Sequence, residues 1–422
     1  MLKLFGGAIT RRTLQTLAWL LLAAGACAQG LTVDEAMRRA AENAPAVRAQ
    51  LAAAAAMADS ALSAAALPDL RLRFGLDNWP IESADKFSTG RDFMTMRRIG
   101  ISREMVREEK LDLRAGRARV EAEREMQGAN DRRLAIRREV ALAYVEGVYA
   151  ERGVVAIDAI ADEARTLVAV LIARVRAGAL RPLEAVAAQA QVRALEDRRR
   201  EVELRQARSR AVLGRWVGGE ASAPLAGFEL ERAHADIARL AGHDDAAHPH
   251  LGVAANGTAA ADNELAQARA AQKGDWSWEV AYQKRGAAFT DMLSIGVAID
   301  LPQLNRGRVE PEVRARQRRK EAALEILEEA RRAHALERAL GLAEWDSALR
   351  RHAAFDATLL PLARERAEQA LAAYRGGGGN LAEVIEARRA ELETRLARLD
   401  LEAAAARAWA QLVYFMHRED RP

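Results

Sequence analysis

The sequence predicts a mainly α-helical protein with a small β-sheet, built from two copies of one structural unit. Three observations lead to this prediction: two pairs of short strands with alternating apolar residues, very long stretches with apolar residues at helical spacing, and a self-similarity between the two halves. Each copy is expected to run helix, strand, strand, long helix, turn, helix. The first copy spans residues 31–218, the second spans 248–415, and a polar connector at 219–247 joins them.

Residues 1–28 have the pattern of a secretory signal peptide. Three cations precede an apolar stretch, and a small-residue cleavage site, Ala26-Cys27-Ala28, follows it. The apolar stretch is short for a membrane-spanning helix, although a retained N-terminal anchor is an alternative. A second alternative is lipidation at Cys27. Because Ala24 stands where a lipobox prefers leucine, we expect ordinary cleavage after Ala28.

Charge and composition argue against a nucleic-acid partner. The 64 basic and 60 acidic residues are interspersed, and removal of the three signal cations leaves a net charge of about +1. Abundant alanine and only 5% aromatic residues suit slim, closely packed helices better than one large core. No later apolar stretch reaches the roughly 18 residues of a membrane helix, so any membrane-spanning part would have to consist of strands.

The two strand pairs give the clearest match between the copies. Strands are expected at about 70–77 and 94–102 in the first copy, and at about 275–283 and 292–300 in the second. The stretch between the matched strands is ten residues longer in the first copy. An extra stretch of this length costs little folding free energy only in a surface loop.

Each expected strand has one apolar face. Arg71 and Arg73 alternate with the apolar residues of the first strand, which are Leu70, Leu72, Phe74 and Leu76. One interpretation is a small soluble sheet packed on the helices. The other is a transmembrane barrel with a polar lumen, in which Trp79 and Trp276 lie near the interfaces. The signal peptide and the long helices favour the barrel. Arg97 shares the apolar parity and must then lie near a rim.

Four strands cannot close a barrel, so closure requires several chains, and three chains would supply 12 strands.

The helices are expected to be unusually long. Residues 103–177 contain no proline and would form a helix of about 110 Å. A similar helix at 310–375 is interrupted near Pro361, where we expect a kink. Glycine-bearing tip turns at 177–182 and 376–380 lead into return helices. The narrow apolar seams of such helices demand coiled-coil partners.

Several segments carry a resemblance to a known family. Residues 31–45 begin Leu-Thr-Val-Asp-Glu-Ala and end in proline, residues 300–308 read Asp-Leu-Pro-Gln-Leu-Asn-Arg-Gly-Arg, and His248-Pro249 opens the second copy. In their order and doubling, these features resemble the TolC family of outer-membrane efflux proteins, over nearly all of the mature chain. The resemblance implies a homotrimer with a 12-stranded barrel in outer-membrane lipid and a periplasmic α-helical tunnel. It also implies a periplasmic adaptor (a membrane fusion protein) and an inner-membrane pump of the resistance-nodulation-division type as partners.

The resemblance places a periplasmic gate at the two glycine turns. The tip tyrosine of the family falls on Tyr374, its constricting acids fall on Glu383 and Glu386, and the acid of the other turn falls on Glu184. An arginine of the family's latch is replaced by Gly379, so the latch must differ here. The turn residues expected to contact the adaptor are Arg176, Gly178, Leu183, Gly377 and Leu381.

The two constricting acids also have a physical interpretation. Glu383 and Glu386 are three residues apart and share one helix face. Threefold symmetry would place six carboxylates around a narrow pore, which concentrates cations and repels anions. The alternative is an ordinary solvated face near a helix N-terminus, where acids are favourable.

No arrangement of residues predicts an enzyme or a cofactor. The sequence shows no phosphate loop, no Ser/His/Asp arrangement and no acid pair tied to a pocket. A polar cluster in the connector could suggest a metal site, but no helix is expected there to fix its geometry, and we assign no metal. Its members are His243, Asp244, Asp245, His248 and His250.

We therefore expect a passive export duct whose energy comes from a partner. The segment after the second strand resembles the CzcC-like divalent-cation efflux branch, which favours export of heavy-metal cations. A multidrug or type I secretion duct is the alternative within the family. A periplasmic adaptor and a soluble coiled-coil structural protein are the alternatives from other classes.

Overall fold

The computed structural model describes residues 30–82, 84–178, 181–240, 245–379 and 381–416. The chain forms two compact units. Of the described residues, the helical unit comprises those within 30–45, 132–240 and 335–416, and the sheet unit comprises those within 46–131 and 245–334. The expected signal peptide, including Cys27, lies outside the described residues.

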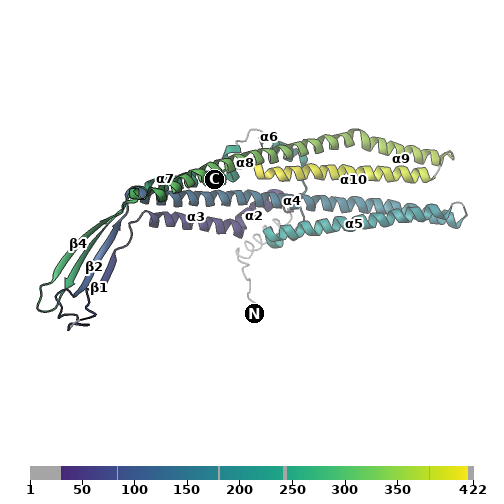
Figure 1. Cartoon of the computed structure of the whole chain (residues 1–422). Coiled ribbons are helices and arrows are strands. Elements are labelled where there is room, and N and C mark those ends of the chain that lie inside the picture. The colour runs from purple at the N-terminus through teal and green to yellow at the C-terminus, as the bar shows by residue number, and fades with distance from the viewer. Residues whose placement is uncertain (1–29, 83, 179–180, 241–244, 380, 417–422) are drawn as a thin grey trace, which may run out of the picture. The chain divides into compact units, whose positions relative to one another are not determined.

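The sheet unit contains one four-stranded antiparallel sheet (Figure 1). Its strands are β1 (Arg71–Asp77), β2 (Met96–Met105), β3 (Trp276–Lys284) and β4 (Met292–Ile299), in the spatial order β1-β2-β3-β4. The hairpins β1–β2 and β3–β4 have equivalent registers. Leu72 faces Ile101 as Trp278 faces Val297, so the same hairpin occurs in both halves of the chain.

The registers give the sheet one apolar and one polar face, because directly paired residues point to the same side. The row Phe74, Ile99, Tyr282 and Leu293 crosses all four strands on the apolar face, and the next row consists of Leu72, Ile101, Val280 and Ile295. Arg97 lies on the apolar face, as its alternation with Ile99 and Ile101 predicted. It lies opposite Leu76 and Lys284, at the end of the sheet where the strands meet their loops.

Four helical segments complete the sheet unit. They are α3 (Pro45–Ala64), the first part of α4 (Glu108–Arg176), α7 (Pro249–Ala270) and the first part of α8 (Arg306–Ala354). Glu264 of α7 lies 2.9 Å from Arg117 of α4 and also pairs with Arg316 of α8. One carboxylate thus links three helices.

Asp275 fastens the start of β3 to the start of α4. Its carboxylate accepts a hydrogen bond from Lys110 Nζ at 2.6 Å and another from the backbone N–H of Arg107 at 3.1 Å. The Arg107 side chain donates to the Gly274 carbonyl at 2.7 Å. The strand-to-helix junction is therefore held by charge-assisted hydrogen bonds on both sides.

Two helix starts differ from the sequence prediction. The first long helix begins at Glu108 rather than at residue 103, because β2 continues to Met105 and pairs with Trp276. The second begins at Arg306 rather than at residue 310, which places Pro311 inside α8. The helix tolerates Pro311 because the carbonyl that loses its partner belongs to Gly307, which is exposed.

The helical unit consists of two long hairpins and two short amphipathic helices. The hairpins are the rest of α4 with α5 (Pro182–Val217), and the rest of α8, continued by α9 (Leu360–Arg375), with α10 (Leu381–Leu412) (Figure 1). The short helices are α2 (Val33–Asn43) and α6 (Leu230–Leu240). A 3-10 turn at Val413–Phe415 ends the described helical part.

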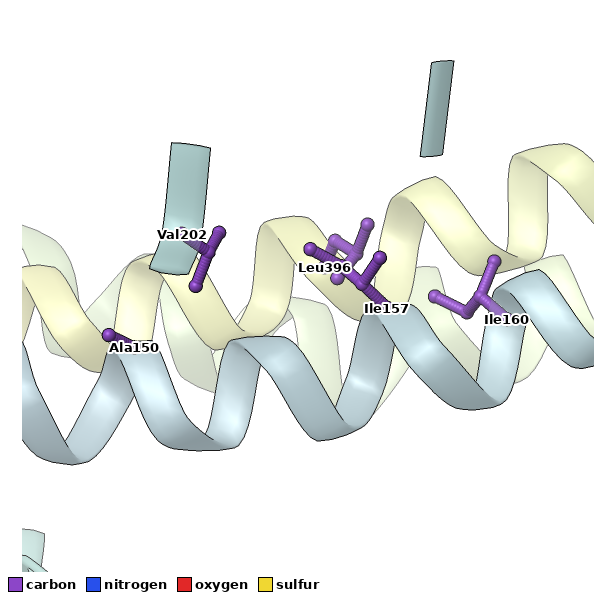
Figure 2. Close-up of a cluster of buried hydrophobic side chains, with 5 residues drawn as sticks. All are labelled: Ala150, Ile157, Ile160, Val202 and Leu396. Carbon is purple, nitrogen blue, oxygen red and sulfur yellow. The ribbon is translucent and has the colours of Figure 1, made fainter. Parts of the chain in front are cut away.

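The core of the helical unit is a seam between these helices. One cluster combines Ala150, Ile157 and Ile160 of α4 with Val202 of α5 and Leu396 of α10 (Figure 2). Val202 and Leu396 belong to helices that are far apart in the sequence. Burial of such aliphatic side chains, at about 1.5–3 kcal/mol each, stabilises the pairing of the two hairpins.

The expected connector at 219–247 is not a bare polar linker. Residues 218–222 form a 3-10 turn, and α6 buries Ala233, Ile237 and Leu240. Its 3.6-residue apolar spacing is the signal that the sequence analysis missed.

The break expected near Pro361 occurs as a π-helical turn at Phe355–Leu359, directly before α9. Proline lacks the N–H that would continue the ladder, and its ring clashes with the carbonyl four residues earlier. A π-turn is one way in which a helix accommodates such a defect.

Candidate functional site

The polar face of the sheet carries a ladder of ion pairs. Arg73 of β1 lies 3.3 Å from Glu279 of β3, and Arg98 of β2 lies 3.7 Å from the same carboxylate. Arg98 also lies 3.2 Å from Asp77. The ladder joins three strands and leaves this face suited to water, because its charges are paired and its side chains remain partly exposed.

The opposite face of the sheet is apolar and uncovered. Phe74 and Ile295 are each 73% exposed, and the exposed apolar residues continue along all four strands. Large contiguous apolar patches are rare on soluble monomers and mark contact with a membrane or a partner.

Aromatic side chains lie toward both ends of this face. Tyr282 and Trp79 lie near the loops, and Trp276 lies where β3 leaves the helices. Trp79 also packs against Phe87 with ring centroids 5.4 Å apart. Aromatic residues at both ends of an apolar band are typical of strands that cross a bilayer.

The second candidate site is the tip of the two hairpins. Gly178 follows α4 with φ +73°, and Gly377 follows α9 with φ +79°. A residue with a side chain would be strained at either position, which explains the glycines. Arg176 and both glycines are exposed, and Leu183 is 75% exposed. The side chain of Leu381 lies outside the described residues.

Tyr374 belongs to an apolar cluster that joins both hairpins at the tip. The buried members of this cluster are Leu171, Ala185, Ala188 and Val384, and the Tyr374 ring packs against them. The guanidinium of Arg174 lies over that ring, 5.3 Å from its centroid. Sequence analysis did not identify Arg174. Its signal was its position in the last turn of α4, as Tyr374 stands in the last turn of α9.

The three expected gate acids have different surroundings. Glu383 and Glu386 are exposed on α10. Glu184 is half-buried in the first turn of α5, and its Oε2 atom is enclosed without a hydrogen-bond partner. The hydrogen bond that Arg389 donates to Glu393 raises the pKa of Arg389, and the charge of Glu386 adds to the effect.

A groove of about 770 Å³ opens between the two hairpins. Its floor is apolar and includes Leu167 of α4, Leu195 of α5 and Leu392 of α10. Its charged lining comprises four arginines and two glutamates, which are Arg198, Arg375, Arg388, Arg389, Glu163 and Glu393. The groove therefore offers an apolar strip with a basic rim.

His248 and His250 lie in the sheet unit. His248 is buried and caps α7, and its Nδ1 atom accepts a hydrogen bond from the His250 N–H at 3.2 Å. The His248 ring lies 4.4 Å from that of His334, and His250 lies 3.7 Å from Asp131. No three potential ligands with metal-binding geometry occur in the part of the chain that the structure describes. His243 and Asp244 lie outside it.

Among the described residues, no helix combines the length and the apolar character needed to cross a membrane.

Comparisons with known proteins support the fold. No protein-family model matches the chain, and no curated protein matches it in sequence. Three similar solved structures are the outer-membrane channel OprN, the outer membrane protein VceC from Vibrio cholerae, and CusC, which forms a transmembrane channel.

The alignments span nearly the whole chain. OprN is 15% identical with a TM-score of 0.73, VceC is 18% identical with 0.72, and CusC is 15% identical with 0.75. Each alignment covers 91% of this chain, and 89%, 95% and 91% of the three structures respectively. The predicted fold of long helices with a small antiparallel sheet is therefore confirmed, and the chain shares it with these three solved structures.

Proposed function

We propose that this chain is the outer-membrane channel subunit of a tripartite efflux system and conducts its substrate passively. The observation that carries the proposal is the four-stranded sheet with one exposed apolar face and one ion-paired polar face. Lipid would cover the apolar face, and the ladder of Arg73, Arg98 and Glu279 would face a water-filled lumen. The likeness to OprN, VceC and CusC supports the same assignment.

The edges of the sheet support assembly into a homotrimer. In the described chain, β1 and β4 each pair on one side only, so the backbone donors and acceptors of the other side are open. Hydrocarbon offers no partner for such groups, and a membrane sheet must therefore close on itself. Three chains would give 12 strands, a number compatible with a water-filled barrel.

Membrane flotation tests the proposal. The full-length chain should float with outer-membrane vesicles and require detergent for release. Recovery in the soluble periplasmic fraction without detergent would contradict the duct and favour a soluble coiled-coil protein or an adaptor.

We place the periplasmic gate at the tip of the hairpins. Tyr374 and Arg174 would hold the two hairpins together, so Arg174 would take the part of the family arginine that is missing at Gly379. A cation–π contact at such a site contributes about 0.5–2 kcal/mol. Glu383 and Glu386, exposed beside this contact, would form the acidic ring, and Glu184 would lie next to it.

The gate is tested by conductance in planar bilayers. Glu383→Gln with Glu386→Gln should lower the cation-to-anion permeability ratio at least twofold, because six carboxylates leave the constriction. Glu365→Gln with Glu368→Gln is the matched control, since these acids are also exposed, three residues apart and on the neighbouring helix α9. An equal effect of both double variants would refute the gate.

The groove between the hairpins is the proposed contact for the periplasmic adaptor. Its apolar floor and basic rim fit an amphipathic helical hairpin that carries acids beside its apolar stripe. The turn residues Arg176, Gly178, Leu183, Gly377 and Leu381 would lie at the end of the same contact. The partner pump of the resistance-nodulation-division type would supply the energy.

Heavy-metal cations are the proposed cargo. The support is the resemblance to the CzcC-like branch and the exposed acids at the tip. Zinc, cobalt and cadmium tolerance of a strain lacking this chain should fall and should return with the wild-type gene. Loss of tolerance to organic antibiotics instead would favour a multidrug duct.

A further inference from the structure

One cross-strand row on the apolar face of the sheet contains two cations. At the loop end of the sheet, Arg97 of β2 lies directly opposite Lys284 of β3. Both side chains are exposed and point to the same side as Ile99 and Tyr282, which form the next row. Directly opposed residues have Cβ atoms about 4.5–5.5 Å apart, and like charges at that distance repel one another.

This pair has no ion-pair partner within contact distance in the described chain, whereas most of the other strand cations have one. Arg71 lies 3.8 Å from Glu104, Arg73 is paired with Glu279, and Arg98 is paired with Asp77. Arg103, at the other end of β2, donates to the Pro68 carbonyl at 3.0 Å. Among the described residues, no carboxylate forms an ion pair with Arg97 or Lys284.

The nearby hairpin adds positive charge. Arg285 follows Lys284 and donates from Nε to the Thr290 carbonyl at 2.7 Å. The acid close to the pair is Asp291, which attracts both cations, although its carboxylate also accepts hydrogen bonds from the Tyr282 hydroxyl and the Arg285 N–H. The four side chains of Arg97, Lys284, Arg285 and Asp291 together carry a formal charge of +2.

A neighbouring chain cannot supply the missing acid through the sheet. The pair belongs to β2 and β3, which are the two inner strands, and any added strand would join at β1 or β4. The counter-charge must therefore come from whatever covers the apolar face. If that covering is lipid, as the proposed function requires, the anion at this height is a headgroup phosphate.

We propose that Arg97 and Lys284 form a binding site for the phosphate of an anionic membrane lipid. The acyl chains would lie along the exposed rows that begin with Ile99, Tyr282 and Leu293. The phosphate oxygens would accept hydrogen bonds from the guanidinium and the ammonium, so the lipid would relieve the repulsion between the two cations. This inference rests on the proposed membrane location.

The test uses the purified full-length chain in vesicles of phosphatidylcholine with or without 10 mol % phosphatidic acid. Flotation first reports membrane insertion. Lipid that remains bound after extraction is then counted by native mass spectrometry. Arg97→Gln with Lys284→Gln should bind phosphatidic acid at least tenfold more weakly than wild type. Arg97→Lys with Lys284→Arg should retain binding, because the charges remain.

The matched control is Arg71→Gln, which removes a cation from the opposite face and should leave binding unchanged. Equal binding by wild type and the double Gln variant would overturn the site. Competition by 10 mM inorganic phosphate that displaces the lipid would show a free-phosphate site instead, and would also overturn it. Failure of wild type to float would refute the membrane location itself and is recorded separately. A double variant that does not float is replaced by the single variants, which must each bind more weakly than wild type.

Discussion

Ile295→Arg tests whether the apolar face meets lipid or water. Ile295 pairs with Val280, which lies four residues from Lys284 at one end of β3 and four from Trp276 at the other. At about 3.4 Å per residue, Ile295 is about 14 Å along the strand direction from each end. Its side chain is 73% exposed and is therefore near the middle of the uncovered face.

The two environments give different costs for this change. If water covers the face, an exposed substitution changes stability by no more than about 0.5 kcal/mol. If lipid covers it, an arginine near the bilayer midplane costs about 2–4 kcal/mol, and a threefold assembly pays it three times, or about 6–12 kcal/mol. A loss of that size is comparable with the whole stability of an ordinary domain.

The measurement is the yield of the chain in the floated outer-membrane fraction, together with the heat resistance of the assembled oligomer. Ile295→Arg should lower both strongly. Ser294→Arg is the control, because Ser294 is the adjacent residue on the polar face and its hydroxyl hydrogen-bonds to Gln283. If the two variants behave alike, the apolar face is not in lipid and the reasoning is wrong.

Two further predictions concern the stability of each unit. Gly147→Ala should destabilise the chain by about 1–3 kcal/mol, because the added Cβ would lie 2.5 Å from Ser209 Oγ. The control Gly214→Ala, whose added Cβ would lie 3.9 Å from its nearest neighbour, should be neutral or slightly stabilising. Thermal unfolding in detergent compares the two variants, and equal melting temperatures would contradict the packing argument. Asp275→Asn should cost about 1–3 kcal/mol at pH 7. Burial raises the pKa of Asp275, but the Lys110 hydrogen bond and the Arg107 N–H outweigh it and hold that pKa below 3.8. A lowered folded-state pKa gives stability that is present at neutral pH and lost as the pH falls below 3.8, so the difference from wild type should shrink there; a difference independent of pH would refute the role of the charge.

Local patterns in the sequence were sufficient to predict the strands and the long helices. Alternation with period two placed the strands to within about three residues, since each strand has one face made mainly of aliphatic or aromatic residues. The helix starts were less accurate. Arg103 interrupts the apolar alternation of β2 before Met105 resumes it, and this charged segment also fits a helix.

The tip could be predicted only in part. The glycines at 178 and 377 were expected from their turn-forming role, and their positive φ angles agree with it. The contact between Arg174 and Tyr374 was not expected, because it depends on how two hairpins from different halves of the chain pack at their ends. No periodicity within one helix carries that information.

The internal duplication also predicts how neighbouring chains should pair. Within one chain, the second strand of the first hairpin pairs with the first strand of the second hairpin, and Ile99 lies opposite Tyr282. In a closed threefold sheet, β4 would meet β1 of the next chain by the same relation. The hairpin registers make Ile295 the equivalent of Ile99, and Leu76 the equivalent of Tyr282.

Ile295 of one chain should therefore face Leu76 of the next, with Cβ atoms about 4.5–5.5 Å apart, a distance that a disulfide can bridge with a small adjustment. In a Cys27→Ser background, which removes the single cysteine of the chain, Leu76→Cys with Ile295→Cys should yield disulfide-linked dimers and trimers on a non-reducing gel. Leu76→Cys with Ser294→Cys should not, because Ser294 points to the opposite face. Cross-linking by the second pair but not the first would show a register shifted by one residue. Absence of any cross-link in assembled channels would mean that the pairing within a chain is not repeated between chains.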